Sequence, residues 1–547
     1  MSARTETQIR AEAPRSSSDR MRDLSHLKKQ DRNHIESSRF RFLVSQREIT
    51  SRARLACFSL ALLLMPVIAI TPAHAAWPFD EFFPRPSVSE RASQILSEAI
   101  RMKTVNPPGR EQALAYRFAE ILSREGIESD VIPTPNPNGG KPRAAVWGRL
   151  RGRGHRPGLI LLSHLDTVPA NPSEWSVPPF SGRIADGYVW GRGALDAKGV
   201  AVTHLMTLLE LASSNQRLER DILFIATPDE ETGGRNGAGW LVANHPELLE
   251  GIGYLLTEGG GIQLPASDET ARPPIWGVAL TEKSPCWLEL RAHGRGGHSS
   301  APTPEDAVPR LVAALDKVRR AESPVRVLTE VEEMFKALAP IAPEWDRAAY
   351  QNLSGSLERD EAFRRRFLDN PGQNALVRNT ISITFLEGGP ATNVAPSVAR
   401  AQLDARLLPG RTCVEFASAI ESLIDDGTIE IAEILSFPTR ASSADSPLMR
   451  AIEAVAARQD PTGLVVPRLI GGFTDAHWFR EVGIVSYGFV PRALTNDEAN
   501  GVHGVDERVA VDALAKSVTL QIDLVRAFDA IESGEKTEKV EKSEKND

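Results

Sequence analysis

Histidine and carboxylate side chains follow three short apolar runs of the sequence. His164 comes after the first run, the acidic stretch Asp229-Glu230-Glu231 after the second, and Glu258 after the third. The runs are residues 159–162, 222–226 and 254–256. Zinc accepts histidine nitrogen and carboxylate oxygen as ligands, and a carboxylate can also serve as a general base. Open α/β sheets carry their ligand sites at the carboxyl ends of the strands, so we expect these side chains to meet at one sheet edge.

Two further signals have an ordinary structural alternative when each is taken alone. In His164-Leu165-Asp166 both polar side chains share one face of a strand, so Asp166 could support a metal-binding His164. A loop histidine beside a capping aspartate is the alternative. Asp196 follows a glycine turn and could either cap a helix or bridge two cations. The turn is not a dinucleotide-binding fingerprint, because the third glycine and the βαβ spacing are wrong.

The adjacent acids Glu230 and Glu231 suggest two different roles. Neighbouring strand residues face opposite ways, so one acid could bind a metal while the other acts as general base. A solvated acidic turn is the alternative for this pair, and an ordinary turn residue is the alternative for Glu258. His503, in the segment 502–507, is one of few histidines in the last third of the chain.

Taken together, these residues form the donor set of a two-zinc site. Two zinc ions that share one aspartate need roughly two histidines and three carboxylates, because zinc accepts about four ligands. One further glutamate remains as a general base. Such a metal pair lowers the pKa of a bridging water toward about 7 and polarises a carbonyl group.

Length and composition exclude several classes of protein. The chain has 547 residues, of which 41% are hydrophobic and 25% charged, as in soluble globular proteins rather than collagen or a polytopic membrane protein. Three cysteines predict neither a disulfide framework nor a zinc finger, so a metal would rest on His, Asp and Glu. The net charge of -8 argues against a nucleic-acid partner, since an acidic protein repels phosphates unless it has a basic patch.

The two ends of the chain differ from its middle. A basic stretch, the apolar segment 55–70 and the small residues Ala73-His74-Ala75 are typical of a bacterial export signal within residues 1–76. The apolar segment is shorter than the roughly 20 residues of a membrane span, but an uncleaved anchor is the alternative. We therefore expect a periplasmic protein that contacts the membrane only if this segment stays uncleaved. Residues 531–547 alternate Glu and Lys, which predicts a disordered tail.

Between these ends, alternating apolar runs and helical segments predict an α/β fold. We expect a central mixed sheet covered by helices, with an inserted α+β lid that also serves dimerisation. Within the lid, the pattern predicts strands near 380–386 and 399–407 and helices over about 325–368. The predicted catalytic domain is split into residues 77–283 and 409–530, and the lid covers residues 284–408.

Eight motifs in chain order resemble a family of co-catalytic dinuclear zinc metallopeptidases. The family includes aminoacylase-1, acetylornithine deacetylase, succinyl-diaminopimelate desuccinylase and carboxypeptidase S. The motifs are SHLDTVP, WGRGALDAKG, PDEETGG, TEGG, GRGGHSSAP, TNVAP, GGFTDAHWF and VHGVDE. The resemblance covers about residues 90–525 and is strongest to the carboxypeptidase S and N-acyl-amino-acid hydrolase branch.

This resemblance implies two Zn²⁺ ions per subunit, with cobalt or manganese as substitutes. Asp196 would bridge the ions, with His164 and Glu258 at one ion and Glu231 and His503 at the other. These side chains would hold a metal-bridging hydroxide.

The resemblance also implies roles for residues that do not bind metal. Glu230 would be the general base, and Asp166 would support the neighbouring histidine ligand. His298 would stabilise the oxyanion from the lid, often across a dimer interface. An Arg fork suits a carboxylate, so a lid arginine would hold the substrate's acid group. The residues implied to contact the substrate are Asn393, Arg406, Gly471 and Gly472.

The implied activity is hydrolysis of an amide bond next to a free carboxylate, in dipeptides or N-acyl amino acids. One alternative is an enzyme that also runs in reverse and joins fatty acids to amino acids, which requires an apolar groove. A distant alternative is a non-catalytic binding protein on the same fold. The partners would be a small-molecule substrate and a second copy bound through the lid. Many relatives have Asp after the bridging aspartate where this chain has Ala197, which leaves open whether bond 196–197 is cis.

Overall fold

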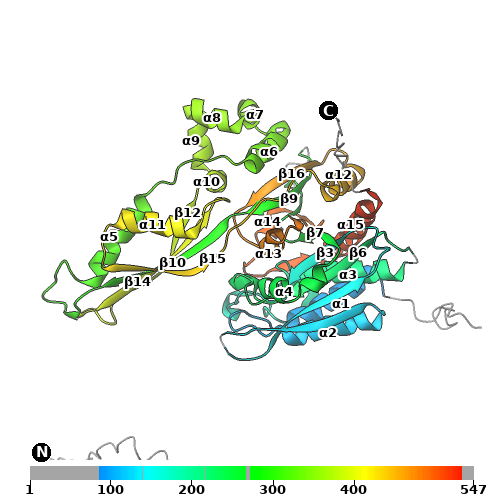
Figure 1. The fold of residues 1–547 in the computed structure, drawn as a ribbon, viewed down its shortest axis with the longest axis horizontal. Coiled ribbons are helices and arrows are strands. Elements are labelled where there is room, and N and C mark those ends of the chain that lie inside the picture. The colour runs from blue at the N-terminus through cyan, green and yellow to red at the C-terminus, as the bar shows by residue number, and fades with distance from the viewer. Residues whose placement is uncertain (1–85, 138, 215, 267–271, 533–547) are drawn as a thin grey trace, which may run out of the picture. The chain divides into compact units, whose positions relative to one another are not determined.

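The structure of the protein is a computed structural model that describes residues 86–137, 139–214, 216–266 and 272–532 (Figure 1). The predicted export signal and the charged residues from 533 onward lie outside these ranges. Within the described ranges, no helix combines the length and the apolar character that crossing a bilayer requires.

A ten-stranded mixed sheet lies at the centre of the fold, as predicted. Its order is β1-β2-β6-β3-β7-β17-β9-β8-β18, and β16 pairs with β9. The strands are β1 (Glu128–Thr134), β2 (Arg143–Leu150), β3 (Arg156–His164), β6 (Arg220–Thr227), β7 (Ile252–Thr257), β8 (Gly261–Gln263), β9 (Ile275–Glu282), β16 (Leu464–Ile470), β17 (Val485–Gly488) and β18 (Ala493–Leu494). β3 is parallel to both β6 and β7, so the three predicted apolar runs are adjacent strands that end at the same edge.

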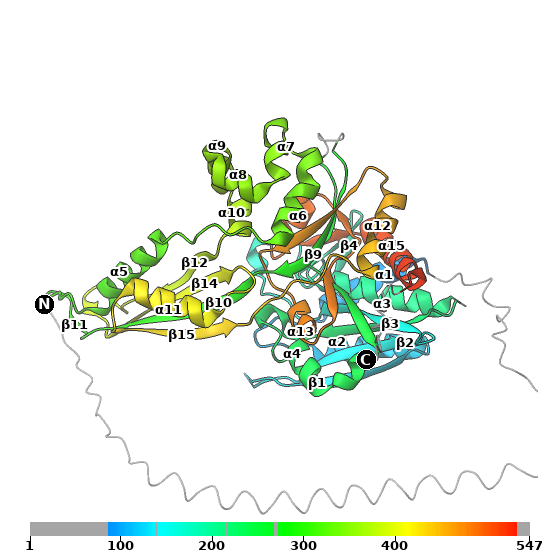
Figure 2. The ribbon, with the colours of Figure 1, turned by 45° about the horizontal axis from the view of Figure 1, so that its top comes forward.

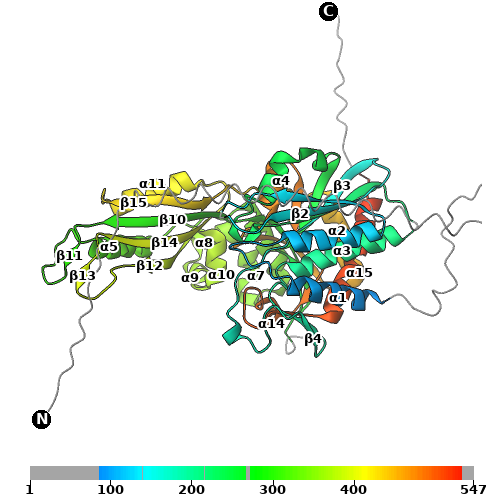
Figure 3. The same cartoon turned by 90° about the horizontal axis from the view of Figure 1, so that it is seen from below.

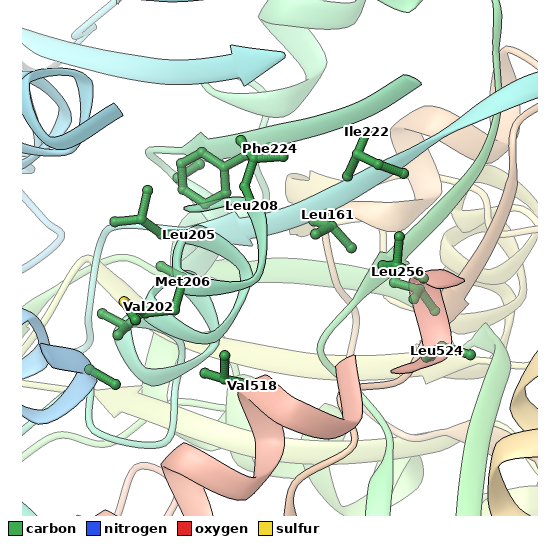
Figure 4. Close-up of a cluster of buried hydrophobic side chains, with 14 of the residues drawn as sticks. Leu161, Val202, Leu205, Met206, Leu208, Ile222, Phe224, Leu256, Val518 and Leu524 are labelled. Carbon is green, nitrogen blue, oxygen red and sulfur yellow. The ribbon is translucent and has the colours of Figure 1, made fainter. Parts of the chain in front are cut away.

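Helices cover both faces of this sheet. They are α1 (Val88–Arg101), α2 (Gln112–Arg124), α3 (Lys198–Ser213), α4 (Ala238–Asn244), α12 (Pro447–Gln459), α13 (Ala476–Glu481) and α15 (Val511–Ala530). α3 packs between β3 and the outer helices α1 and α15, so almost all of its side chains are buried. Figure 4 shows this core, where Val202 and Leu205 of α3 lie among Leu161 of β3 and Val518 of α15. On the other face α4 and α13 pack against Ile160 and Leu162.

The inserted lid is built on a second, four-stranded antiparallel sheet, called the lid sheet below. Its order is β12 (Thr380–Glu387), β14 (Val398–Leu407), β10 (Ser284–His293) and β15 (Ile429–Ser436). Helices α5 (Ala307–Arg320) and α11 (Cys413–Ile424) pack together on one face of it (Figure 1). Buried and open side chains alternate along β14, as expected of an antiparallel sheet with one covered face.

The lid extends further along the chain than the sequence suggested. The predicted boundary at residue 408 falls before α11 and β15, yet both belong to the lid sheet and its core. The three cysteines predicted no disulfide framework, but two of them, Cys286 of β10 and Cys413 of α11, form a single disulfide. Paired cysteines that are 127 residues apart leave no spacing signal in the sequence, and tertiary packing alone brings them together.

Between α5 and β12 the chain forms a small cluster of helices. They are α6 (Thr329–Leu338), α7 (Glu344–Tyr350), α8 (Leu353–Arg359), α9 (Glu361–Asp369) and α10 (Pro371–Val377), which agrees with the helical character predicted over 325–368. Phe335, Phe363 and Phe367 form its core, together with Leu469 of β16. This helical cluster therefore backs the strand β16.

Two short ladders complete the structure. β19 (Arg508–Ala510) pairs with β5 (Tyr188–Trp190), which pairs with β4 (Arg183–Ala185). This ladder brings the segment after His503 next to the segment before Asp196. β11 (Gly297–His298) pairs with β13 (Val394–Ala395) at the end of the lid sheet (Figures 2 and 3).

Candidate metal centre

One half of the candidate centre is built around His164, the last residue of β3. Its Nε2 atom lies 2.9 Å from Oδ1 of Asp196 and 3.4 Å from Oε1 of Glu258. Glu258 directly follows the neighbouring strand β7, and His164 is almost fully buried. The parallel pairing of β3 and β7 thus brings these two side chains to one sheet edge, as predicted.

The other half is built around His503, which follows the short helix α14 (Asn496–Ala499). Its Nε2 atom lies 3.1 Å from Oδ2 of Asp196 and 3.2 Å from Oε2 of Glu231. The two oxygens of Asp196 therefore face different histidines, one in each half. The structure brings all five predicted metal ligands together, and bond 196–197 is cis.

Glu230 and Glu231 reach the two halves from a turn rather than from a strand. β6 ends at Thr227, and both acids lie in a single 3-10 turn, Glu230–Thr232, that follows Asp229. Asp229 has a φ of 81°, in the left-handed region, which ends the extended backbone. Oε2 of Glu230 lies 3.8 Å from Nε2 of His164, whereas Glu231 contacts His503. The two acids therefore lie in different halves, as expected. The reason given from strand alternation was wrong, because both acids lie in a turn.

Burial and close neighbours shift the pKa values of these groups. Burial raises the pKa of Glu230 well above its ordinary value and that of Glu258 to about 7. Burial would also raise the pKa of Asp196, but hydrogen bonds with His164 and His503 outweigh it and lower that pKa. The hydrogen bond with Asp196 raises the pKa of His503 to about 10.

This donor set fits divalent metal ions. Ligand atoms of His164, Glu230 and Glu258 lie within 4.8 Å of one another, as do those of His164, Asp196 and Glu231. Carboxylates crowded into a buried place are costly unless a positive charge balances them. Mixed nitrogen and oxygen donors at this spacing suit zinc and similar ions.

Asp166 lies against the first half and contacts the turn that carries Glu230 and Glu231. Its Oδ1 atom lies 3.4 Å from Nδ1 of His164 and accepts a hydrogen bond from the backbone N–H of Glu230. Its Oδ2 atom accepts from the N–H of Glu231 and from Nδ2 of Asn106. One buried carboxylate therefore orients a histidine ligand and the turn that carries both acids.

Glu507 is a positioning residue that the sequence did not reveal. Its Oε1 atom accepts from the backbone N–H groups of Leu195 and Asp196, at 2.7 and 3.1 Å. Its Oε2 atom accepts from Nη1 of Arg192, whose Nη2 donates to the carbonyl of His503. This clamp joins the loops of Asp196 and His503, and its only signal was its place in the His503 motif.

A second buried network fixes the turn that carries Glu230. Arg143 of β2 donates to Oδ1 of Asp229 at 2.7 Å and also pairs with Glu111. The neighbouring Asp475 is buried as well, and Thr227 donates to its Oδ2 atom. The sequence did not single out Glu111, Arg143 or Asp475, because their partners are distant along the chain.

A pocket of about 780 Å³ opens beside the candidate centre. Arg406 and Gly472, two of the predicted substrate contacts, line it. The guanidinium of Arg406 lies 5.1 Å from the ring of Phe473 and 5.6 Å from that of Trp287. Asp404 holds it with two contacts, of 2.7 and 3.1 Å.

Two predicted site residues, His298 and Asn393, lie away from the candidate centre. His298 is exposed in the β11–β13 ladder, at the end of the lid sheet opposite the central sheet (Figures 2 and 3). Asn393 lies in the same place, where its carbonyl accepts from the N–H of Ser299. Gly471 is exposed beside Gly472. The structure of a single chain therefore does not bring His298 or Asn393 to the metal ligands.

Comparison with known proteins decides the family. The model of peptidase family M20/M25/M40 matches residues 160–527. The chain belongs to this family. The resemblance predicted from the eight motifs is thereby confirmed, and the protein is a hydrolase of the metallopeptidase and aminoacylase type that acts on peptides or acyl amino acids.

Similar M20 proteins span most of the chain. A probable carboxypeptidase S-like 2 of Dictyostelium discoideum is 30% identical, over 67% of this chain and 71% of its own. The N-fatty-acyl-amino acid synthase/hydrolase PM20D1 of Xenopus tropicalis is 28% identical, over 86% and 93%. The M20 family metallo-carboxypeptidase Sso-CP2 from Sulfolobus solfataricus has the same fold, with a TM-score of 0.64 at 20% identity, over 80% of this chain and 99% of its own.

Proposed function

We propose that this M20 enzyme hydrolyses the amide bond of N-acyl amino acids next to their free carboxylate, with Glu230 as general base. The observation that carries the proposal is Asp196, whose two oxygens face His164 and His503 while Glu230 lies beside His164. The ligands of one zinc ion would be His164, Asp196 and Glu258, and those of the other Asp196, Glu231 and His503. When bound, the ions would polarise the scissile carbonyl and make water a stronger nucleophile.

The role of Glu230 follows from its surroundings. Its carboxylate would take a proton from the attacking water and deliver it to the leaving nitrogen. Burial raises its pKa, which brings the proton affinity of the carboxylate closer to that needed near neutral pH. The backbone N–H of Glu230 is held by Asp166, so the base is positioned before substrate binds.

Apolar walls of the pocket suit the aliphatic part of an acyl group. Ile262, Ile470, Leu494 and Val502 line it beside the metal ligands. Such walls bind aliphatic groups through burial of apolar surface. Arg406 would hold the substrate's free carboxylate, because its Nη1 atom is buried and makes no hydrogen bond within the described residues.

Replacing Glu230 tests the proposed mechanism. In Glu230→Gln we expect kcat to fall on the order of 10²- to 10⁴-fold, because an amide cannot accept the proton. Metal content and thermal unfolding should stay close to those of the wild type. The exposed Glu250→Gln is a matched control that should keep its activity. Normal turnover by a folded, metal-loaded Glu230→Gln protein would rule the assignment out.

Synthesis in the reverse direction is the second candidate function. The apolar pocket and the similarity to PM20D1 of Xenopus tropicalis both favour it. Incubating the enzyme with oleate and an excess of amino acid, followed by mass spectrometry, tests it. N-oleoyl product that depends on Glu230 would support synthesis, and its absence at high amino-acid concentration would exclude it.

We also propose a homodimer formed through the lid. β12 is an edge strand of the lid sheet, and it exposes the large apolar side chains Ile383, Phe385 and Leu386. Exposed apolar edge strands readily pair with another chain. A second copy could bring its own His298 to this chain's centre, which a single chain does not do. Light scattering of the wild type and of Phe385→Glu tests the proposal.

Export to the periplasm remains part of the proposed function. The signal-like segment within residues 1–76 supports it, as does the disulfide between Cys286 and Cys413, because disulfides persist in oxidising compartments. Retention of the N-terminal segment would leave the enzyme anchored to the membrane. Cell fractionation and the N-terminal sequence of the mature protein distinguish these outcomes.

A further inference from the structure

The pocket contains an arginine, Arg468, whose charge no acidic side chain of the described residues balances. Arg468 of β16 lines the same pocket as Glu230 and Glu258. Within the described part of the chain its one hydrogen bond runs from Nη2 to Oε1 of Gln263, at 3.0 Å, and its Nε atom is buried without a partner. Burial alone lowers the pKa of Arg468. A guanidinium in this state is poorly solvated and poorly paired.

Each of the other two arginines of the pocket has an acidic neighbour. Asp404 holds Arg406 with two contacts. Arg492 donates to the carbonyl of Leu195 and has the charge of Asp196 close by. Arg468 is therefore the pocket arginine that lacks an acidic neighbour among the described residues.

The surroundings of Arg468 are built to hold its side chain in the pocket. On the neighbouring strand β9, a Cβ atom at Gly277 would lie 2.4 Å from Nε of Arg468, so glycine leaves the space that the side chain occupies. Nε2 of Gln263 donates to Oδ1 of Asn496 at 2.6 Å, which fixes the amide that Arg468 contacts. Behind β16, Leu469 is buried in the helical cluster.

The location of Arg468 indicates which part of the substrate it would contact. Gln263 comes five residues after the proposed metal ligand Glu258, so at most about 18 Å of chain separates the two. Apolar Ile262 and Ile470 lie next to Gln263 and near Arg468 along the same strands. An aliphatic chain could extend from the scissile amide along these walls and end at the guanidinium.

We propose that Arg468 binds a second carboxylate, at the end of the substrate's acyl portion remote from the scissile amide. This inference rests on the proposed function and narrows its substrates to amides of dicarboxylic acids or of acidic peptides. An Arg fork offers a carboxylate two parallel hydrogen bonds, whereas a methyl end would leave the guanidinium unpaired.

Matched substrates test the proposal. N-acyl amino acids with a terminal carboxylate on the acyl chain are compared with methyl-ended acyl chains of the same length, from four to ten carbons. Dipeptides that begin with Glu are compared with those that begin with Gln, to separate the two sources of the carboxylate. We expect the wild type to prefer the carboxylated member of at least one series by about 10- to 100-fold in kcat/KM.

Variants then assign the preference to Arg468. Arg468→Met should abolish or reverse the kcat/KM ratio, and Arg468→Lys should retain part of it. Gly277→Ala should reduce the ratio while keeping the arginine, because the added Cβ displaces the guanidinium. Arg458→Met, on the exposed end of α12, makes the same charge change outside the pocket and should keep the ratio.

Two results would overturn the inference. One is a wild type without preference for carboxylated substrates, and the other is an equal loss with both members of a pair in Arg468→Met. Equal loss would place Arg468 on the amino acid's own carboxylate instead. Calorimetry with a free α,ω-dicarboxylic acid measures binding at Arg468 independently of turnover. Binding that requires Arg468 would support the subsite even if no acyl amino acid is hydrolysed, and no binding together with no preference would exclude it.

Discussion

The edge of the central sheet and the end of the lid sheet are organised in opposite ways. At the first, His164 is about 1% exposed, and the buried carboxylates of Asp166 and Glu507 accept hydrogen bonds from backbone N–H groups and so hold the loops of the predicted ligands. At the second, His298 is exposed, and its Nδ1 atom accepts one bond, from the N–H of Ser300. The five predicted metal ligands therefore lie together within one chain, whereas the lid groups predicted to act on the substrate lie away from them.

Removal of metal should have the largest effect on activity. It also tests whether the edge of the central sheet is a catalytic centre or only a structural one. Chelation should abolish hydrolysis, and zinc, cobalt or manganese should restore it. The buried acids around Asp196 would then lose the positive charge that balances them. The free energy of unfolding should therefore fall by about 4 kcal/mol relative to enzyme with metal present at 1,000 times its Kd. Activity assays and calorimetry with and without chelator check both. Unchanged turnover after complete removal would contradict a catalytic metal centre.

The variant His298→Ala tests whether the end of the lid sheet takes part in catalysis. If the imidazole stabilises the oxyanion, kcat should fall about 10²- to 10³-fold with metal content unchanged. Mixing His298→Ala with Glu230→Gln should restore part of the activity, because one centre of a mixed dimer would have both residues intact. Exposed His155→Ala is the control. No restoration despite mixed dimers would show that the lid does not act on its partner's centre.

Glu507→Gln probes how far the central sheet edge is preorganised. The amide keeps the shape of the clamp but cannot pair with Arg192 or accept from all of its donors, which also include the N–H of Gly193, so metal affinity should fall about 10- to 100-fold. Excess metal should recover much of the activity, as expected of a positioning residue. The neighbouring Asp506→Asn, which contacts Ser176 at the surface, should change little. Metal titration followed by calorimetry distinguishes the two variants.

The last prediction concerns the pH dependence of the free energy of unfolding rather than activity. Burial raises the pKa of Asp475 to about 8, above the ordinary value of 3.8, so the folded state holds this proton more tightly than the unfolded state. The associated stability is present at low pH and is lost as pH rises through 8, by at most about 4 kcal/mol from pH 5 to 8. Asp475→Asn should flatten this slope in denaturant unfolding. A slope identical to that of the wild type would assign it to other groups.

Local patterns were sufficient for a large part of the fold and the centre. Three apolar runs, each ending in His or an acid, predicted adjacent strands with ligands at one edge, because strand burial and side-chain alternation are local properties. The motif order then linked His503 to ligands more than 240 residues away, and those ligands do meet. The lid boundary at 408 failed because nothing in the local pattern shows that β15 pairs with β10.

The sequence by itself determined which residue types could bind metal, which strand ends carry them, and that an α+β unit interrupts the catalytic domain. Only the tertiary structure decided that Asp196 faces two histidines, that Glu507 clamps their loops, and that His298 lies apart from them. It alone also revealed Arg468 as a pocket arginine that has no acidic neighbour in the part of the chain that the structure describes. The physical reason is that burial and pairing depend on neighbours in space, which come from residues tens to hundreds of positions apart.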